Sequence, residues 1–342
     1  MTLALSYASG ASDKPLLGST IGEFFNYAVK HYSDREAIVS IHQQVRLTYW
    51  QLAERVDILA KAFIQADFKK GDRIGIWSPN NVEWLITQYA TAKVGLILVT
   101  INPAYRSHEL AYVLKQSGCK GLVLQNKFKS SNYEQMLCEL CPELRKVSPG
   151  KLVSKEFELL TTIISTTESP ISGIYSWDEF NHLGNESSDQ LLVSRLKDQD
   201  MDDPINIQYT SGTTGFPKGA TLSHHNILNN GYFVAETMNF DESDRLVVPV
   251  PLYHCFGMVM ANLGCLTHGA CAIYPSEAFE PEAVLDAVQK EKATALYGVP
   301  TMFIAELALP NFSEYDLKTL RTGIMAGAPC PVDTMNQVNE KM

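Results

Sequence analysis

The sequence has no long apolar run and no basic cluster, and each absence excludes a class of partner. Its longest apolar stretches, such as Val94–Ile101, have the length of buried strands and fall well short of the roughly 20 residues that cross a bilayer. No run of Lys or Arg exceeds Lys69-Lys70, and the net charge of the 342-residue chain is −10. Because binding to nucleic acid needs a concentrated basic surface, we expect no nucleic-acid partner and no transmembrane segment.

Cysteine is sparse and scattered. Only Cys138 and Cys141 have a suggestive spacing, and one such pair without a second pair predicts neither a zinc site nor a redox centre. The odd count of seven cysteines, with no secretory signal, indicates a reducing compartment. The first twenty residues also lack the arginines of a mitochondrial transit peptide, so we expect the cytoplasm, with the mitochondrial matrix as the alternative.

Two common nucleotide-binding motifs are missing as well. No Gly-x-Gly-x-x-Gly element follows a predicted strand, which argues against a dinucleotide fold. Residues 209–219 do not form a Walker A loop, because Pro217 precedes Lys218 and Gly219 follows it, where that loop needs Gly-Lys-Ser/Thr.

The same segment, 209–219, is nevertheless the most informative part of the chain. It reads Tyr-Thr-Ser-Gly-Thr-Thr-Gly-Phe-Pro-Lys-Gly, which combines hydroxyl donors, two glycines and one lysine. Such a run can turn several N–H groups and a positive charge toward one anion, although surface turns also use these residue types. We therefore predict that it binds a nucleotide polyphosphate through Thr210, Ser211, Gly212, Thr213, Thr214, Gly215, Phe216, Pro217 and Lys218.

Strand and helix patterns alternate along most of the chain, which predicts an α/β fold with largely parallel sheets. The pattern weakens between about 145 and 204, so we place one αβ subdomain at 1–204 and a second, carrying the loop, at 205–342. Helices are predicted at 49–66, 81–93, 107–116, 256–267, 280–291, 301–308 and 331–342, and one follows Ser223 as N-cap. Strands are predicted at 73–77, 96–101, 121–124, 205–209, 245–250, 271–274, 294–299 and 320–325.

Five segments have distinctive sequences, at 95–105, 209–219, 251–257, 297–303 and 323–329. In this order they resemble the core motifs of the AMP-forming adenylating enzymes, the superfamily of acyl-CoA synthetases, luciferases and peptide-synthetase adenylation domains. Their sequences are most similar to those of the medium-chain fatty acyl-CoA ligases, the group of acyl-CoA synthetase family member 2. The resemblance runs from about Gly18 to the end and implies the layered N-terminal large domain of that fold.

The resemblance implies a reaction in two halves. A carboxylate first attacks the α-phosphate of ATP to give an acyl-adenylate and diphosphate, and the thiol of coenzyme A then takes the acyl group. The implied small-molecule substrates are a fatty acid, ATP and coenzyme A, with Mg²⁺ as the metal. Lys218 would supply catalytic charge to the phosphates, and Thr214 would touch Mg²⁺.

The resemblance implies that two further motifs contact the acid substrate. His254 would lie near the substrate carboxylate or gate the acyl channel, with a structural histidine as the alternative. Phe256 would line the channel together with Met258 and Met260, although apolar residues at helical spacing are also typical of plain core. Gly327, Ala328 and Pro329 would pass along the adenine and the acyl chain.

The later motifs of the resembled superfamily, including its small C-terminal domain, do not occur before residue 342. We therefore expect a truncated ligase that adenylates little by itself. The alternatives are a non-catalytic module that binds nucleotide or acyl chains, or docks with a separately encoded C-terminal portion, and an adenylating enzyme for another carboxylic acid.

Overall fold

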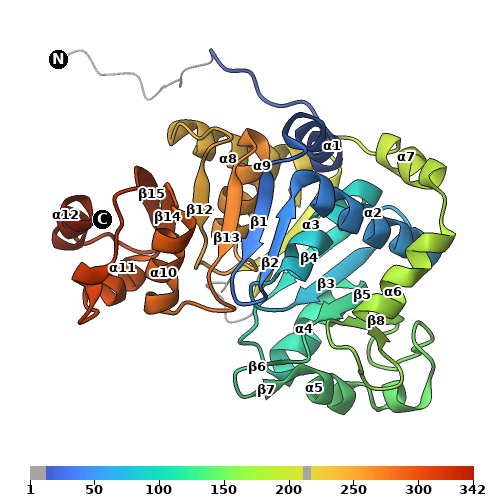
Figure 1. The fold of residues 1–342 in the computed structure, drawn as a ribbon. Coiled ribbons are helices and arrows are strands. Elements are labelled where there is room, and N and C mark those ends of the chain that lie inside the picture. The colour runs from blue at the N-terminus through green and yellow to red at the C-terminus, as the bar shows by residue number, and fades with distance from the viewer. Residues whose placement is uncertain (1–12, 211–216) are drawn as a thin grey trace, which may run out of the picture.

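The computed structural model describes residues 13–210 and 217–342. Two large sheets carry most of the strands, and the pair β6–β7 forms a third, small sheet (Figure 1). The strands are β1 Glu36–Ser40, β2 Val45–Thr48, β3 Arg73–Trp77, β4 Ile97–Ile101, β5 Cys119–Leu124, β6 Lys127–Phe128, β7 Ser131–Asn132, β8 Thr162–Ser165, β9 Tyr175–Ser176, β10 Pro204–Thr210, β11 Lys218–Ser223, β12 Arg245–Val247, β13 Cys271–Tyr274, β14 Ala295–Gly298 and β15 Thr322–Met325.

Helices cover both faces of each large sheet. They are α1 Ile21–Tyr32, α2 Tyr49–Gln65, α3 Val82–Val94, α4 Ser107–Ser117, α5 Tyr133–Leu140, α6 Trp177–Leu183, α7 Asp189–Lys197, α8 His224–Thr237, α9 Gly264–His268, α10 Pro281–Glu291, α11 Pro300–Leu307 and α12 Val332–Lys341. A π-helix, η3, spans Phe256–Leu263, and short 3-10 turns lie at Pro142–Lys146 (η1), Gly184–Glu186 (η2) and Phe312–Glu314 (η4).

Both large sheets are mainly parallel, as the alternation of strands and helices predicts. The seven-stranded sheet has the order β11-β10-β4-β3-β5-β8-β9, and only β11 runs antiparallel to its neighbour. The six-stranded sheet has the order β15-β14-β12-β13-β1-β2, with β2 as its antiparallel edge. The fold is thus α/β, as predicted.

The buried residues divide into layers that follow the pleat of the strands. Ile74 of β3 and Leu98 of β4 belong to a central cluster that also contains α1, α2, α3, η3 and one face of the six-stranded sheet. Trp77 and Val99, on the opposite face of the same strands, pack against α4 and α5. Because α10 and α11 cover the outer face of the six-stranded sheet, five layers alternate between helix and sheet.

The strands of each sheet come from both sides of residue 204. The strands β1 and β2 lie in the six-stranded sheet beside β13, and β10 and β11 extend the seven-stranded sheet beside β4. The predicted boundary at 204 therefore does not separate one sheet from the other.

Most predicted elements occur within one or two residues of their expected bounds, and the helix starts have a clear local cause. Thr48 caps α2 in a reciprocal pair with Gln51, and Ser223 caps α8 in the same way with Asn226. These pairs satisfy N–H groups that the first helical turn leaves without partners.

The local structure differs from the prediction in three places. The strand expected at 245–250 ends at Val247, since Pro249 and Pro251 have no N–H for a sheet ladder. The helix expected at 256–267 is a π-helix followed by the short α9. Between the glycine-rich loop and α8 lies the unpredicted strand β11, which forms because β10 offers it an antiparallel partner.

Candidate active site

The two ends of the glycine-rich segment belong to the paired strands β10 and β11. Thr210 ends β10 and is paired with Lys218, the first residue of β11, and both residues are exposed. Helix α4 holds the returning strand, since the Tyr112 hydroxyl donates to the Pro217 carbonyl at 3.1 Å. The hairpin therefore presents Thr210 and Lys218 to solvent at the two ends of the loop.

The loop residues themselves lie outside the described part of the chain. This applies to Ser211, Gly212, Thr213, Thr214, Gly215 and Phe216. The predicted contacts of these residues with phosphate and of Thr214 with a metal stay predictions. Within residues 13–210 and 217–342, no group of three or more His, Cys, Asp or Glu side chains could hold a metal ion.

His254 has a defined tautomer. Its Nδ1 accepts a hydrogen bond from the Phe256 backbone N–H at 3.1 Å, and the Cys255 Sγ lies 3.6 Å from the same nitrogen. Nδ1 is therefore unprotonated in the neutral ring, and Nε2 carries the hydrogen. Desolvation by the surrounding protein lowers the pKa of the imidazole below its ordinary value, which favours this neutral form. Because the residue is exposed, its Nε2–H can donate to a bound carboxylate.

Asn80 joins the carboxyl edges of the two large sheets. It follows β3, and its Nδ2 donates to the Val250 carbonyl at 3.0 Å while its Oδ1 accepts from the Leu252 N–H at 2.9 Å. Its own N–H donates to the carbonyl of Glu277, which follows β13. In open α/β sheets, ligands bind outside the carboxyl ends of the strands, and this side chain brings two such edges together.

An apolar crevice of about 200 Å³ lies at this junction. It is lined by residues from three of the predicted motifs: Asn102–Ala104, the segment around Tyr253, and Met302. The strands β4 and β10 are parallel neighbours, so the loop hairpin leaves the sheet at the edge where Asn102–Ala104 begin. The tertiary structure thus gathers segments that are far apart in sequence around one crevice.

The predicted substrate residue Phe256 is buried, with its ring centroid 5.4 Å from that of Tyr297. Met258 lies deeper, and its sulfur accepts a hydrogen bond from Gln208 Nε2 at 2.9 Å. These contacts are those of core side chains, and the contact of Phe256 with an acyl chain stays a prediction.

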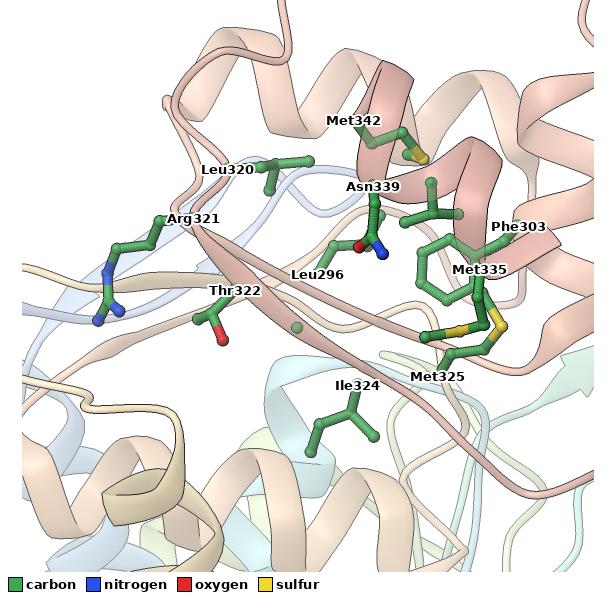
Figure 2. Close-up of a pocket in the computed structure, with 12 residues that line it drawn as sticks. Leu296, Phe303, Leu320, Arg321, Thr322, Ile324, Met325, Met335, Asn339 and Met342 are labelled. Atoms are coloured by element: carbon green, nitrogen blue, oxygen red, sulfur yellow. The ribbon is translucent and has the colours of Figure 1, made fainter. Parts of the chain in front are cut away.

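Gly327, Ala328 and Pro329 are exposed and follow β15 at the same carboxyl edge of the six-stranded sheet that carries His254 after β12. Gly327 has φ +85°, a left-handed conformation that favours glycine. A groove of about 280 Å³ runs beside them between β15 and α12, lined by side chains such as Phe303, Met335 and Met342 (Figure 2). None of the three predicted residues lines this groove.

Sequence reasoning missed Asn80, Gln88 and Phe279. Asn80 and Phe279 belong to the crevice, and Gln88 reaches the π-helix that follows His254. Asn80 could have been found, because it lies three residues after a predicted strand, at the end where ligands bind. Nothing in the local pattern of Gln88 or Phe279 marks them.

Comparison with known proteins bears directly on this site. The sequence matches the AMP-binding enzyme family over residues 25–342. The chain belongs to the AMP-binding enzyme family. This confirms the membership that the five motifs indicate.

Two relatives within this family illustrate the match. The chain is 45% identical over 327 residues to the putative acyl-CoA synthetase YngI of Bacillus subtilis, covering 96% of the chain and 59% of the relative. It is 43% identical to the mitochondrial medium-chain acyl-CoA ligase ACSF2 of Mus musculus, covering 99% of the chain and 56% of the relative. The chain therefore spans somewhat more than half the length of these curated relatives.

Solved structures show the same fold. The anthranilate CoA ligase AuaEII in complex with anthranoyl-AMP has a TM-score of 0.79 at 23% identity, covering 98% of this chain and 60% of that one. A long-chain-fatty-acid-CoA ligase, FadD1 of Archaeoglobus fulgidus, has a TM-score of 0.77 at 21% identity, covering 98% and 63%. The predicted layered fold of adenylate-forming enzymes is thereby confirmed.

Proposed function

We propose that the full-length protein is an AMP-forming fatty acyl-CoA ligase that prefers medium-chain acids. The observation that carries the proposal is the apolar crevice at the junction of the two carboxyl edges, which is lined by Tyr253, the residue before His254. The loop hairpin leaves the seven-stranded sheet at its carboxyl edge. Membership in the family supports it, as does the similarity to a relative named medium-chain acyl-CoA ligase.

The proposed first step joins the acid to AMP. A carboxylate oxygen attacks the α-phosphorus of ATP, the bond to the diphosphate breaks, and an acyl-adenylate forms. His254 donates its Nε2–H to the carboxylate and orients it, since a neutral donor holds the anion without neutralising it. Lys218 and Thr210 lie at the ends of the loop that faces the polyphosphate, where a positive charge offsets the charge that develops on the leaving group.

The proposed second step is thioester formation. The coenzyme A thiol loses its proton and attacks the carbonyl carbon, and the acyl–oxygen bond breaks to release AMP. Adenylation favours this step because AMP is a far better leaving group than oxide. The apolar crevice beside Tyr253 suits the alkyl chain, which gains free energy when it leaves water.

Mg²⁺ is proposed to bind together with ATP, whose phosphates would supply its oxygen ligands, with Thr214 as the protein contact. Within residues 13–210 and 217–342, no helix combines the length and the hydropathy of a membrane span. We keep the cytoplasm as the proposal and the mitochondrial matrix as the alternative.

The test is octanoate-dependent exchange of labelled diphosphate into ATP by the full-length protein, followed by acyl-CoA formation after coenzyme A is added. We expect both, with no exchange when the acid is omitted. Exchange without acyl-CoA would indicate an adenylating enzyme with another acceptor, and exchange with aryl acids alone would shift the substrate class. A folded protein with no exchange contradicts the proposal and favours a non-catalytic binding module.

The same assay on residues 1–342 alone tests whether this region suffices. We expect little or no exchange from it, with circular dichroism confirming that the sample is folded. Exchange equal to that of the full-length protein would show that this region carries the adenylation machinery.

A further inference from the structure

The segment that follows His254 is held by a buried set of polar side chains. The π-helix η3 begins at Phe256, whose N–H donates to His254 Nδ1. The position of the imidazole therefore depends on where the first turn of η3 lies. π-Helices are rare and occur mostly as single-turn bulges, frequently at functional sites. An eight-residue π-helix such as η3 therefore needs support from its surroundings.

Side chains from neighbouring elements provide that support. Gln88 of α3 donates from Nε2 to the Met258 carbonyl at 3.0 Å, and the Tyr89 hydroxyl donates to the Asn262 carbonyl at 3.0 Å. The Tyr297 hydroxyl of β14 donates to the Met260 carbonyl at 3.4 Å. Three carbonyls of η3 thus accept hydrogen bonds from outside the helix.

The Asn262 side chain completes the set. Its Nδ2 donates to Gln88 Oε1 at 2.9 Å, and its Oδ1 accepts from the Tyr274 hydroxyl at 2.7 Å. Both polar atoms of the Gln88 amide are therefore hydrogen-bonded, Nε2 to the helix backbone and Oε1 to Asn262. All of these side chains are buried, with 4% of Gln88 and 1% of Asn262 exposed. A buried network is stable only when each member is satisfied, so losing one partner disturbs the others.

We infer that Gln88, Tyr89 and Asn262 act as positioning residues that hold η3 in its π register and thereby place His254. This inference rests on the proposed function, in which His254 contacts the carboxylate of the acid. Without the bond from Gln88, the Met258 carbonyl keeps only donors from its own helix, and η3 can relax toward the tighter α register. That change moves the Phe256 N–H and, with it, the imidazole that the N–H holds.

A matched pair of tyrosines separates positioning from general stability. The Tyr49 hydroxyl donates to the carbonyls of Cys265 and Ala270, at 3.2 and 2.8 Å, in the regular helix α9 and directly after it. Tyr49 and Tyr89 are equally buried, at 2% and 3% exposure, and each holds carbonyls of the same continuous stretch. Of the two hydroxyls, that of Tyr89 bonds to the π-helical part and that of Tyr49 bonds beyond it, so Tyr49→Phe is the control for Tyr89→Phe.

The experiment compares Gln88→Met, Tyr89→Phe and Tyr49→Phe in the full-length protein by hydrogen exchange at the Phe256 amide and by steady-state kinetics with octanoate. We expect Gln88→Met to speed exchange at Phe256 and to lower kcat/KM for octanoate, each about tenfold, with the KM for ATP unchanged. Tyr89→Phe should give a smaller change of the same kind. Tyr49→Phe should change neither the exchange rate at Phe256 nor kcat/KM, even if it lowers the melting temperature as much as Tyr89→Phe does.

The inference is overturned if folded Gln88→Met and Tyr89→Phe keep the wild-type exchange rate at Phe256. It is equally overturned if Tyr49→Phe speeds that exchange as much as Tyr89→Phe does, since the effect would then reflect stability alone. If the wild-type protein activates no fatty acid, the proposed function is wrong, and the exchange measurements still decide whether these residues position His254.

Discussion

The β10–β11 hairpin and the π-helix η3 both carry residues predicted to handle substrate, yet they are built in opposite ways. The hairpin is an exposed edge whose backbone pairing holds Thr210 opposite Lys218. The π-helix is buried, and side chains from α3, β13 and β14 satisfy its polar groups. The hairpin therefore holds exposed side chains by backbone pairing, whereas the polar groups of the π-helix are bonded to buried side chains of neighbouring elements.

The largest effect is expected at the hairpin. Lys218→Ala should lower kcat of the full-length protein by roughly 10²–10³, the cost of removing one preorganised group that stabilises developing charge. Stability should not change, because Lys218 is exposed. Steady-state kinetics and thermal unfolding measure the two quantities. Lys290→Ala, which removes an exposed lysine from α10, is the control and should leave kcat unchanged.

If Lys218→Ala also lowers the melting temperature markedly, Lys218 supports the fold, and the contrast between the exposed hairpin and the buried helix is wrong. A kcat within twofold of the wild type would remove Lys218 from the proposed chemistry.

Glu306 of α11 contrasts with the polar groups of η3, because one of its carboxylate oxygens is buried without a partner among the described residues. Its Oε2 is buried without a hydrogen bond among the described residues, and burial raises the pKa of the carboxyl to about 8. The unfolded carboxyl loses its proton near pH 4.5, so between pH 4.5 and 8 the folded state binds more protons than the unfolded state. The free energy of unfolding should therefore fall as pH rises through this window, by up to about 1.4 kcal/mol per pH unit from this group.

Glu306→Gln tests this dependence by urea unfolding at several pH values. The variant should lose the slope and exceed the wild type in stability at pH 8.5, while the two converge near pH 4.5. An identical slope in both proteins would show that Glu306 ionises normally in the folded state.

The packing of η3 gives a third, smaller effect. A Cβ on Gly231 of α8 would come within 2.9 Å of the Val259 carbonyl oxygen, which cannot move without shifting the helix. Gly231→Ala should therefore cost about 1–3 kcal/mol through overpacking, measured by urea unfolding. Gly264 lies at the same interface, but its Cβ would meet nothing closer than 3.4 Å, so Gly264→Ala should be neutral or stabilising. Equal effects at both glycines would mean that η3 is not tightly confined.

The smallest effect concerns the anchor of the hairpin. Tyr112→Phe removes the hydrogen bond to the Pro217 carbonyl, which contributes about 1 kcal/mol net, together with the bond that Gln116 Nε2 donates to the hydroxyl at 2.8 Å. We expect the KM for ATP to rise about fivefold with kcat nearly unchanged, since the loop loses preorganisation but keeps its groups. Tyr27→Phe, at an exposed position on α1, is the control. An unchanged KM would show that the hairpin is held by strand pairing alone.

Much of this molecule follows from local sequence. The capped start of α2, the strand at 73–77 and the helix at 280–291 were all predictable, because their causes lie within a few residues of one another. The five motifs predicted the family for the same reason. The hydroxyls and glycines of a phosphate loop are informative as a short run, whatever the rest of the chain does.

The arrangement of the site depends on the tertiary structure. Asn80 meets Val250, and Gln88 meets Met258, across 170 residues of chain in each case. No periodicity predicts such pairs, because an amide side chain looks the same in sequence whether it hydrogen-bonds a distant carbonyl or faces solvent. The strand β11 and the π register of η3 likewise exist only because neighbours supply their hydrogen bonds. The sequence alone therefore determined which groups this protein carries, and only long-range packing decided which of them face a ligand and which hold the others in place.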